Sequence, residues 1–284
     1  MKNENIELNI KRSKILVAIL ISGTLLSYSG WFYFTNNYSL ALDSSVWGTF
    51  GDFFGGVLNP LIASIAFYWI TVSVWTQKTE LEETKKALVD QSVTQEKMRF
   101  EDTFFSLLEQ HNKILEQLNV TEIINNRVSK SYVEKMTRAI IDSSLPVIDA
   151  KSKLHEEFNS SCGHYFRVLY QLLKLIAVNY KDNLISPKFS CDEINNSPIT
   201  DGEKFYSNIV RSFISFDMAK LLAVNCVCES QDDTYYRYRL LIERYNFLEH
   251  MPIDNQIMEG ATENYDESVF GESEFFAEYK ARRV

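Results

Sequence analysis

The sequence has few of the residues that interrupt helices. It contains five prolines and ten glycines among 284 residues, and neither type occurs between Pro60 and Pro146. Low-complexity tracts and internal repeats are also absent. With 45% hydrophobic and 24% charged residues, the composition excludes wholesale disorder and predicts a folded chain of one or two domains.

Strong catalytic signatures are missing as well. The sequence has no Gly-rich phosphate loop, no nucleophile elbow and no HExxH motif. Cys162, Cys226 and Cys228 could join His164 as four zinc ligands, but their one-residue spacings differ from those of common zinc motifs. We therefore expect structural thiols, no metal and no cofactor.

Charge is absent from two long segments. Residues 15–34 form a run of twenty without a charged side chain, which as a helix spans about 30 Å, the thickness of a bilayer core. Residues 57–75 form a second such run of nineteen. A signal peptide is the alternative for the first run, but its aromatic end, Trp31 to Phe34, is typical of a retained membrane anchor.

Basic residues flank these runs and do not enter them. Lys11, Arg12 and Lys14 precede the first run, Lys78 follows the second, and residues 15–77 contain no Lys or Arg. The positive-inside rule then places residues 1–14 and everything after the second span in the cytoplasm, with the link 35–46 outside. The prediction is a two-span transmembrane helical hairpin over residues 15–75.

Four glycines gather at the entrance to the second span. Gly51 and Gly55 have a small-xxx-small spacing, which allows two helix backbones to approach closely. We expect either a tight re-entry or a packing surface here; Asp52, the ionisable residue nearest this span, is alternatively part of a polar path. The candidate residues are Gly48, Gly51, Asp52, Gly55, Gly56, Asn59 and Pro60.

The remainder predicts an all-α fold. Residues 76–97 form a juxtamembrane stalk, with Val74, Leu81 and Leu88 at heptad spacing, so we expect a homo-oligomer joined by a short coiled coil. Residues 98–251 form a cytoplasmic helical bundle. Its expected features are helices near residues 132–141 and 164–180, a loop at 182–198, a helix at 204–227 after a Thr200–Glu203 capping box, and a last helix at 233–249.

The end of the chain and its net charge complete the outline. Residues 252–284 are acidic, and we expect a solvated, partly flexible tail, with a short docking helix around Phe270 to Tyr279 as the alternative. The whole chain has a net charge of -9, which disfavours non-specific binding to nucleic acid.

Several segments together resemble a known bacterial family. They are "GTFGDFFGGVLNP", "RFEDTFFSLLEQHNKIL", "YFRVLYQLLKLI", "KFYSNIVRSFIS" and "LLIERYNFLEHM", which occur in this order between Trp47 and Met251. The chain is similar to the putative phage abortive infection proteins. The resemblance implies defence against bacteriophage, in which an infected cell stops growing or dies before progeny are released, and a location in the bacterial inner membrane. It implies no established chemistry.

One pair of residues supports an enzymatic alternative. Five residues separate Arg244 from His250, a spacing that resembles the R-x4-6-H motif of HEPN-type ribonucleases. There the Arg stabilises phosphate charge and the His assists attack by the RNA 2′-hydroxyl, without metal. Nucleic acid is an expected partner only under this alternative. The plain alternative is that His250, at the expected helix end, satisfies terminal carbonyl groups.

Two other arginines lie in strongly apolar helices. Arg167 and Arg211 either bind a phosphate or pair with a carboxylate such as Asp217 or Glu243 inside the bundle. His111 and His164 are expected to pack or cap.

The favoured function is a non-enzymatic membrane effector. Its partners are the lipid bilayer, further copies of the chain and a phage-derived trigger that the cytoplasmic bundle senses. A membrane-tethered ribonuclease and a scaffold that recruits another effector stay open as alternatives.

Overall fold

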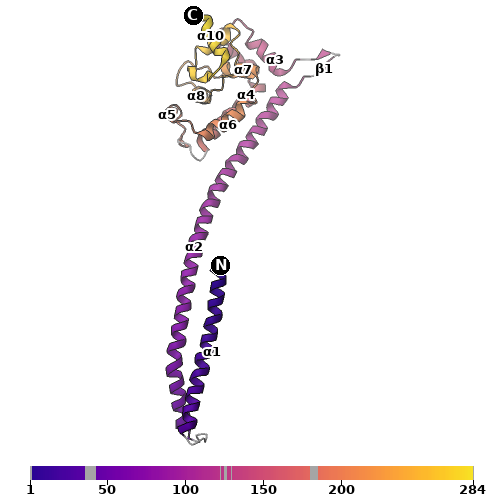
Figure 1. Ribbon diagram of the computed structural model, residues 1–284. Helices are drawn as coiled ribbons and strands as arrows, with labels where there is room; N and C mark the ends of the chain where they lie inside the picture. The colour runs from indigo at the N-terminus through magenta and orange to yellow at the C-terminus, as the bar shows by residue number, and fades with distance from the viewer. Residues whose placement is uncertain are drawn as a thin grey trace. The chain divides into compact units, whose positions relative to one another are not determined.

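The computed structural model describes residues 2–35, 43–121, 123–124, 127–128, 130–179 and 185–283 (Figure 1). Across these residues the chain is all-α, as predicted. The described strands are two residues long: β1, Ile123–Ile124, pairs antiparallel with β2, Arg127–Val128. The chain divides into two compact units, Met1–Gln91 and Ser92–Val284.

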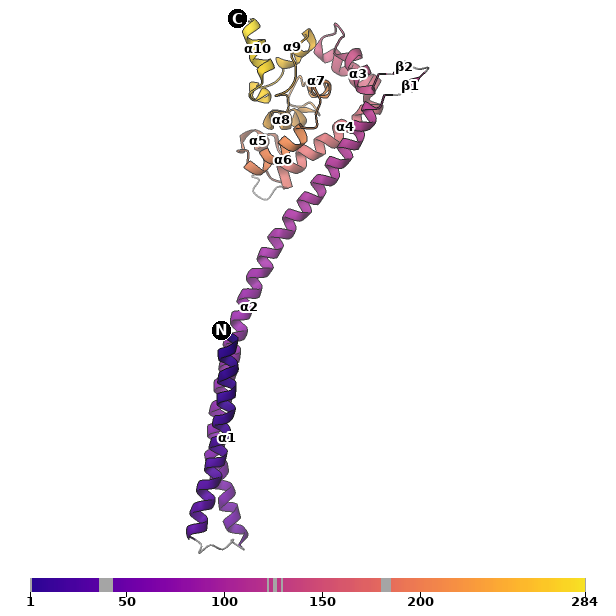
Figure 2. The same ribbon diagram turned by 45° about the vertical axis from the view of Figure 1, so that its right-hand side comes forward.

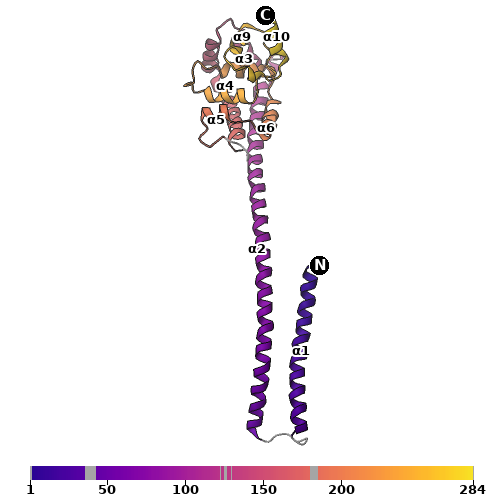
Figure 3. The same cartoon turned by 60° about the vertical axis from the view of Figure 1, so that its left-hand side comes forward.

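The first unit contains a helical hairpin. Helix α1, Lys2–Thr35, runs beside the first part of α2, Ser44–Asn119 (Figures 1 and 3). The ring of Tyr28 holds the two helices together, with its centroid 4.7 Å from that of Phe50 and 5.2 Å from that of Phe53. Most of the predicted link at 35–46 lies outside the described residues, and α2 already begins within it.

Both hairpin helices are long and apolar enough to cross a membrane, through Leu8–Trp31 in α1 and through the apolar part of α2. Their large side chains are not covered by protein: Leu26 is 73% exposed and Phe67 is 72% exposed. A core helix of a soluble bundle would bury such residues. Exposure, length and composition therefore agree with predicted spans.

The glycines of α2 do not form an irregular re-entry. Helix α2 is assigned as continuous from Ser44, and Pro60 lies inside it. A Cβ atom added at Gly48, Gly51 or Gly56 would meet nothing within 4 Å. The irregular backbone expected at these residues is therefore not observed, and glycine and proline are tolerated within membrane-spanning helices. Within the chain these glycines face open space.

The second unit is built around one long helix. Helix α4, Val147–Asn179, packs against α3, Tyr132–Ile140; α6, Asp201–Arg211; α7, Phe216–Asn225; and α9, Gln256–Thr262 (Figure 2). Leu169, Leu172, Leu173 and Ile176 of α4 are completely buried. This confirms the expectation of a central apolar helix there.

Three expected elements differ from the structure. Residues 182–198 contain a short helix, α5, Cys191–Asn196, which Ser190 and Glu193 close with a capping box. The single helix expected at 204–227 is two helices, α6 and α7, because the Ser215 hydroxyl accepts a hydrogen bond from the Met218 amide and begins a new helix. Helix α8, Tyr236–Arg244, is shorter than predicted.

The expected solvated tail is folded. After α9 come a 3-10 helix, η1, Glu267–Phe270, and α10, Glu274–Arg283. Phe270 is 1% exposed, and the buried Tyr265 hydroxyl donates to the Ala223 carbonyl oxygen at 2.6 Å. The acidic residues of this segment lie between apolar residues that pack into the core, so its charge misled the prediction, whereas the alternative of a short terminal helix was right.

Candidate ligand pocket and the predicted site residues

Arg244 is a buried anchor for the segment before α6. Its guanidinium Nη1 donates to the carbonyl oxygens of Ile194 at 2.9 Å and Ser197 at 2.7 Å, and Nη2 donates to that of Pro198 at 3.1 Å. These three acceptors lie at and just beyond the end of α5. The side chain therefore fastens the α5–α6 connection to the end of α8.

Glu203 completes this anchor. Its Oε2 receives Arg244 Nε at 2.9 Å, lies 2.8 Å from Nη2, and accepts from the Tyr245 hydroxyl at 3.2 Å. Four hydrogen bonds and this ion pair thus engage every nitrogen of the Arg244 guanidinium group. Thr200 does cap α6, with its hydroxyl accepting from the Glu203 amide, but the Glu203 side chain does not reach back as the predicted capping box required, because Arg244 holds it.

The ribonuclease pair is not assembled into a site. Every guanidinium nitrogen of Arg244 already has a partner within the protein, and its side chain is only 4% exposed. His250, beyond the end of α8, is exposed to solvent. Arg211 forms an ion pair with Glu249 and donates to the Asn246 carbonyl oxygen at 3.0 Å. Its partner is therefore a carboxylate, although neither of the two suggested by the sequence.

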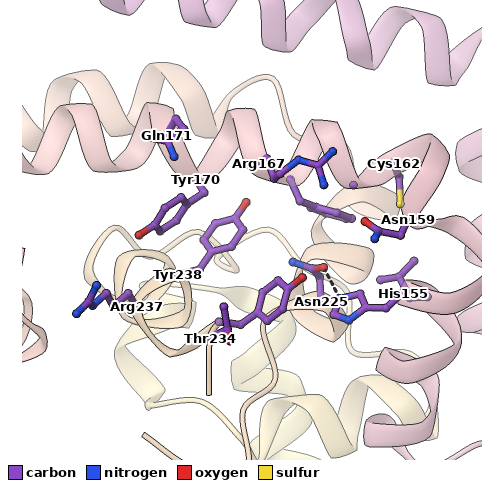
Figure 4. A pocket seen from close by; sticks show the side chains of 14 residues that line it. His155, Asn159, Cys162, Arg167, Tyr170, Gln171, Asn225, Thr234, Arg237 and Tyr238 are labelled. Carbon is purple, nitrogen blue, oxygen red and sulfur yellow. Dashed lines mark hydrogen bonds between the residues drawn. The ribbon is translucent and has the colours of Figure 1, made fainter. Parts of the chain in front are cut away.

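A pocket of about 500 Å³ lies elsewhere in the second unit, between α4, the end of α7 and the start of α8 (Figure 4). One face of α4 supplies most of its wall, including Asn159, Arg167 and Tyr170, and α8 supplies Arg237 and Tyr238. The α4 residues lie three or four positions apart, so they share one side of the helix. Arg167, predicted to bind phosphate or pair with a carboxylate, is an exposed residue of this wall.

The pocket is cationic within an acidic protein. Among the residues that the structure describes, its lining contains Arg167 and Arg237 but no Asp or Glu. The neighbouring carboxylate, Asp233, is paired with Lys151 at 3.1 Å. Because the chain carries a net charge of -9, this local excess of positive charge makes the pocket the natural place for an anion.

Gly163 leaves space on the α4 wall for two polar side chains, Asn159 and Arg167. A Cβ atom at this position would lie 2.0 Å from Asn159 Oδ1 and 3.2 Å from Arg167 Nη1. A side chain at this position would require Asn159 and Arg167 to shift from where they lie across the helix. The absence of a side chain at Gly163 therefore places an amide and a guanidinium side by side.

Tyr238 contributes a buried hydroxyl with no hydrogen-bond partner among the described residues. Figure 4 shows this hydroxyl pointing toward α4, and the Tyr238 ring lies 5.2 Å from that of Tyr170, edge to face. Burial raises the pKa of Tyr238 well above its ordinary value, so the hydroxyl stays protonated and can donate. A buried donor without a partner is uncommon and needs a ligand or water.

The cysteines do not add a nucleophile. Burial raises the pKa of Cys162, in the pocket wall, to about 11, and burial likewise raises that of Cys228 to about 11. Both are neutral thiols at physiological pH. In the described part of the chain no three His, Cys, Asp or Glu side chains gather as a metal site.

Comparison with protein families identifies the region around the pocket. Residues 157–256 match the family described as putative phage abortive infection protein. The resemblance noted from the sequence is confirmed over this segment, which contains the whole pocket lining except Leu154 and His155. Curated proteins and solved structures give no match.

Sequence reasoning did not find the pocket. A signal was available in "TYYRYR", residues 234–239, where tyrosines and arginines alternate at the start of a helix. A second was the polar Asn159 and Arg167 four residues to either side of Gly163. Neither pattern shows by itself that α4 and α8 face each other, which only the fold provides.

Proposed function

We propose that this protein is a membrane-anchored anti-phage defence protein of the abortive-infection type. The observation that carries the proposal is the family match over residues 157–256, whose description names phage abortive infection. In this proposal the second unit senses infection, and the hairpin is the effector or the oligomerising element in the bacterial inner membrane.

Uncovered apolar side chains support the membrane location. The spans of α1 and α2 expose residues that water disfavours, among them Ile70 at 62% and Trp31 at 73%. Lipid is the solvent that accepts such surfaces over the length of a helix. Lys11, Arg12 and Lys14 before α1's apolar run, with Lys78 after the second, favour cytoplasmic ends.

Open space beside the glycines supports self-association. A Cβ atom added at Gly48, Gly51 or Gly56 would meet none of the described residues within 4 Å, so this flat helix surface is open to another helix. Further along α2, Leu81 is 68% exposed and Leu88 is 59% exposed, at heptad spacing. Both surfaces suit contact with further copies of this chain, and Asp52, exposed between Gly51 and Gly55, would lie near such a contact.

The geometry favours this effector over the tethered ribonuclease. Arg244 stabilises the fold through Glu203 and three carbonyl oxygens, and its side chain is only 4% exposed, whereas His250 faces solvent. A metal-independent ribonuclease needs both groups at one phosphate.

The decisive experiment replaces residues 1–75 with an unrelated two-span anchor of the same orientation. We expect the wild type to depolarise the membrane during infection, and the replacement to lose both this depolarisation and phage resistance at unchanged protein level in the membrane. His250→Ala is the matched variant: it should keep resistance and leave cellular RNA as intact as in the wild type.

Two results would contradict the proposal. Full resistance with the foreign anchor would reduce the hairpin to a tether and favour a scaffold that recruits another effector. RNA cleavage that precedes depolarisation and vanishes in His250→Ala would favour the ribonuclease.

A further inference from the structure

We infer that the pocket between α4 and α8 binds a nucleotide, with Arg167 and Arg237 attracting its phosphate groups and the tyrosines contacting its base. Binding follows from the pocket itself. The role of that nucleotide as the infection signal rests in addition on the proposed function.

The charge of the lining selects an anion. Arg167 and Arg237 come from different helices, and both are exposed, so their guanidinium groups can reach a ligand without first breaking a buried ion pair. Guanidinium groups bind phosphate oxygens through charge-assisted hydrogen bonds. The described lining residues include no carboxylate that would repel a phosphate or neutralise the two arginines.

The remaining wall suits an aromatic base better than a bare phosphate ion. Tyr170, Tyr235 and Tyr238 line the pocket, and nucleobases bind proteins by contact with such rings. Asn159 and Gln171 provide amide groups that can donate to and accept from base edges. A volume of about 500 Å³ is within the range of small-molecule sites and exceeds what one inorganic phosphate fills.

An independent observation points to a missing ligand. The Tyr238 hydroxyl is buried in the pocket wall, it remains a donor, and no described residue accepts from it. The other hydroxyl of the ring pair, on Tyr170, belongs to a half-buried side chain. An acceptor atom on a bound nucleotide, such as a ring nitrogen or a phosphate oxygen, would satisfy Tyr238.

The test measures, by calorimetry, how tightly a defined set of probes binds to the full-length protein in detergent micelles. The set contains the four common ribonucleoside triphosphates, their monophosphates and one cyclic dinucleotide, with inorganic phosphate and adenosine as probes that carry only one feature each. We expect at least one nucleotide to bind more tightly than both single-feature probes.

Three variants locate the site. Arg167→Gln and Arg237→Gln should each weaken nucleotide binding roughly tenfold, the loss typical of one charge-assisted hydrogen bond. Tyr238→Phe should weaken it while leaving the thermal stability of the free protein unchanged or higher, because it removes a buried hydroxyl without a partner. Arg138→Gln, which removes the same charge from a half-exposed side chain on α3, is the control and should bind normally.

The outcomes distinguish failure of the nucleotide site from failure of the proposed defence function. Failure of every nucleotide, affinity no higher than for inorganic phosphate, or unchanged affinity in both pocket arginine variants overturns the nucleotide site. If Arg167→Gln and Arg237→Gln bind poorly yet protect cells from phage as the wild type does, the pocket is not the sensor, although the proposed defence function stands. Joint loss of binding and of resistance supports the sensor.

Discussion

The two units use the same kinds of side chain in opposite ways. In the first unit, Leu26, Phe67 and Ile70 are more than half exposed. Of the hydrophobic residues that the structure describes in this unit, only Leu58 is buried. In the second, Leu, Ile, Val and Phe side chains form one continuous core to which α4 and α7 contribute most. The first unit therefore needs an apolar partner outside the chain, and the second does not.

This difference in burial suggests different roles for the two units. A surface that must be covered by lipid or by further copies responds to its surroundings, whereas a closed core can hold a pocket in fixed geometry. The second unit has both a core and a cationic pocket, and the first has exposed helix faces with glycines in open space. This contrast suits a sensor in one unit and an effector in the other.

Separation of the units gives the largest expected effect. A fragment of residues 92–284 should be soluble, helical and unfold in one cooperative transition, while residues 1–91 fused to a soluble reporter should sediment with membranes. The reason is that the core of the second unit buries its apolar residues without help from the first. Sedimentation of bacterial lysates and thermal unfolding by circular dichroism provide the measurements. An insoluble 92–284 fragment would show that the second unit is not self-sufficient.

Within the second unit, Arg244→Met should have the next largest effect. It leaves the Glu203 carboxylate buried without its cation, which costs about 3–5 kcal/mol of unfolding free energy for a fully buried pair. Burial already raises the pKa of Glu203, and Arg244 opposes that rise, so Glu203 should take up a proton in the variant. Denaturant unfolding of the full-length protein in detergent measures the loss.

A second substitution tests the cause of that loss. Adding Glu203→Gln to Arg244→Met removes the isolated carboxylate and should restore part of the stability. His250→Ala, at an exposed position, should unfold like the wild type. An Arg244→Met protein of normal stability that has lost only phage resistance would contradict the structural role assigned to Arg244.

The sequence predicted what depends on local pattern. Charge-free runs, the apolar periodicity of α4 and the Thr200 cap each follow from residues within a few turns of one another, and all three are observed. Three of the five blocks that carry the family resemblance lie within residues 157–256, and the family match confirms the resemblance there.

What failed depends on long-range partners. Glu203 has the right spacing for a capping box, but Arg244, forty-one positions later, captures its carboxylate. The acidic segment after Pro252 is held by Ile257, Phe270 and Tyr279, whose burial no local charge pattern reveals. Arg167 could be named as a phosphate candidate from sequence, but Arg237 and Tyr238 could not be placed opposite it without the fold.

His111 provides the smallest of the predicted effects and tests how closed the second core is. The side chain is fully buried against the Tyr165 ring, at 4.7 Å between centroids, and Nε2 has no hydrogen-bond partner among the described residues. Burial lowers the pKa of His111, with an opposing contribution from Asn112. In the unfolded chain this histidine has an ordinary pKa of about 6.5. Below that pH the unfolded chain therefore binds a proton at His111 more readily than the folded chain does.

Stability should therefore fall as the pH drops below about 6.5, with a His111 contribution of at most about 1.4 kcal/mol per pH unit. His111→Gln removes this contribution, so its unfolding free energy should change less between pH 7 and pH 5 than that of the wild type. His250→Gln, which deletes an exposed histidine, should keep the wild-type slope. Equal slopes for His111→Gln and the wild type would mean that water or a partner reaches His111, and that the core of the second unit is more open than its packing indicates.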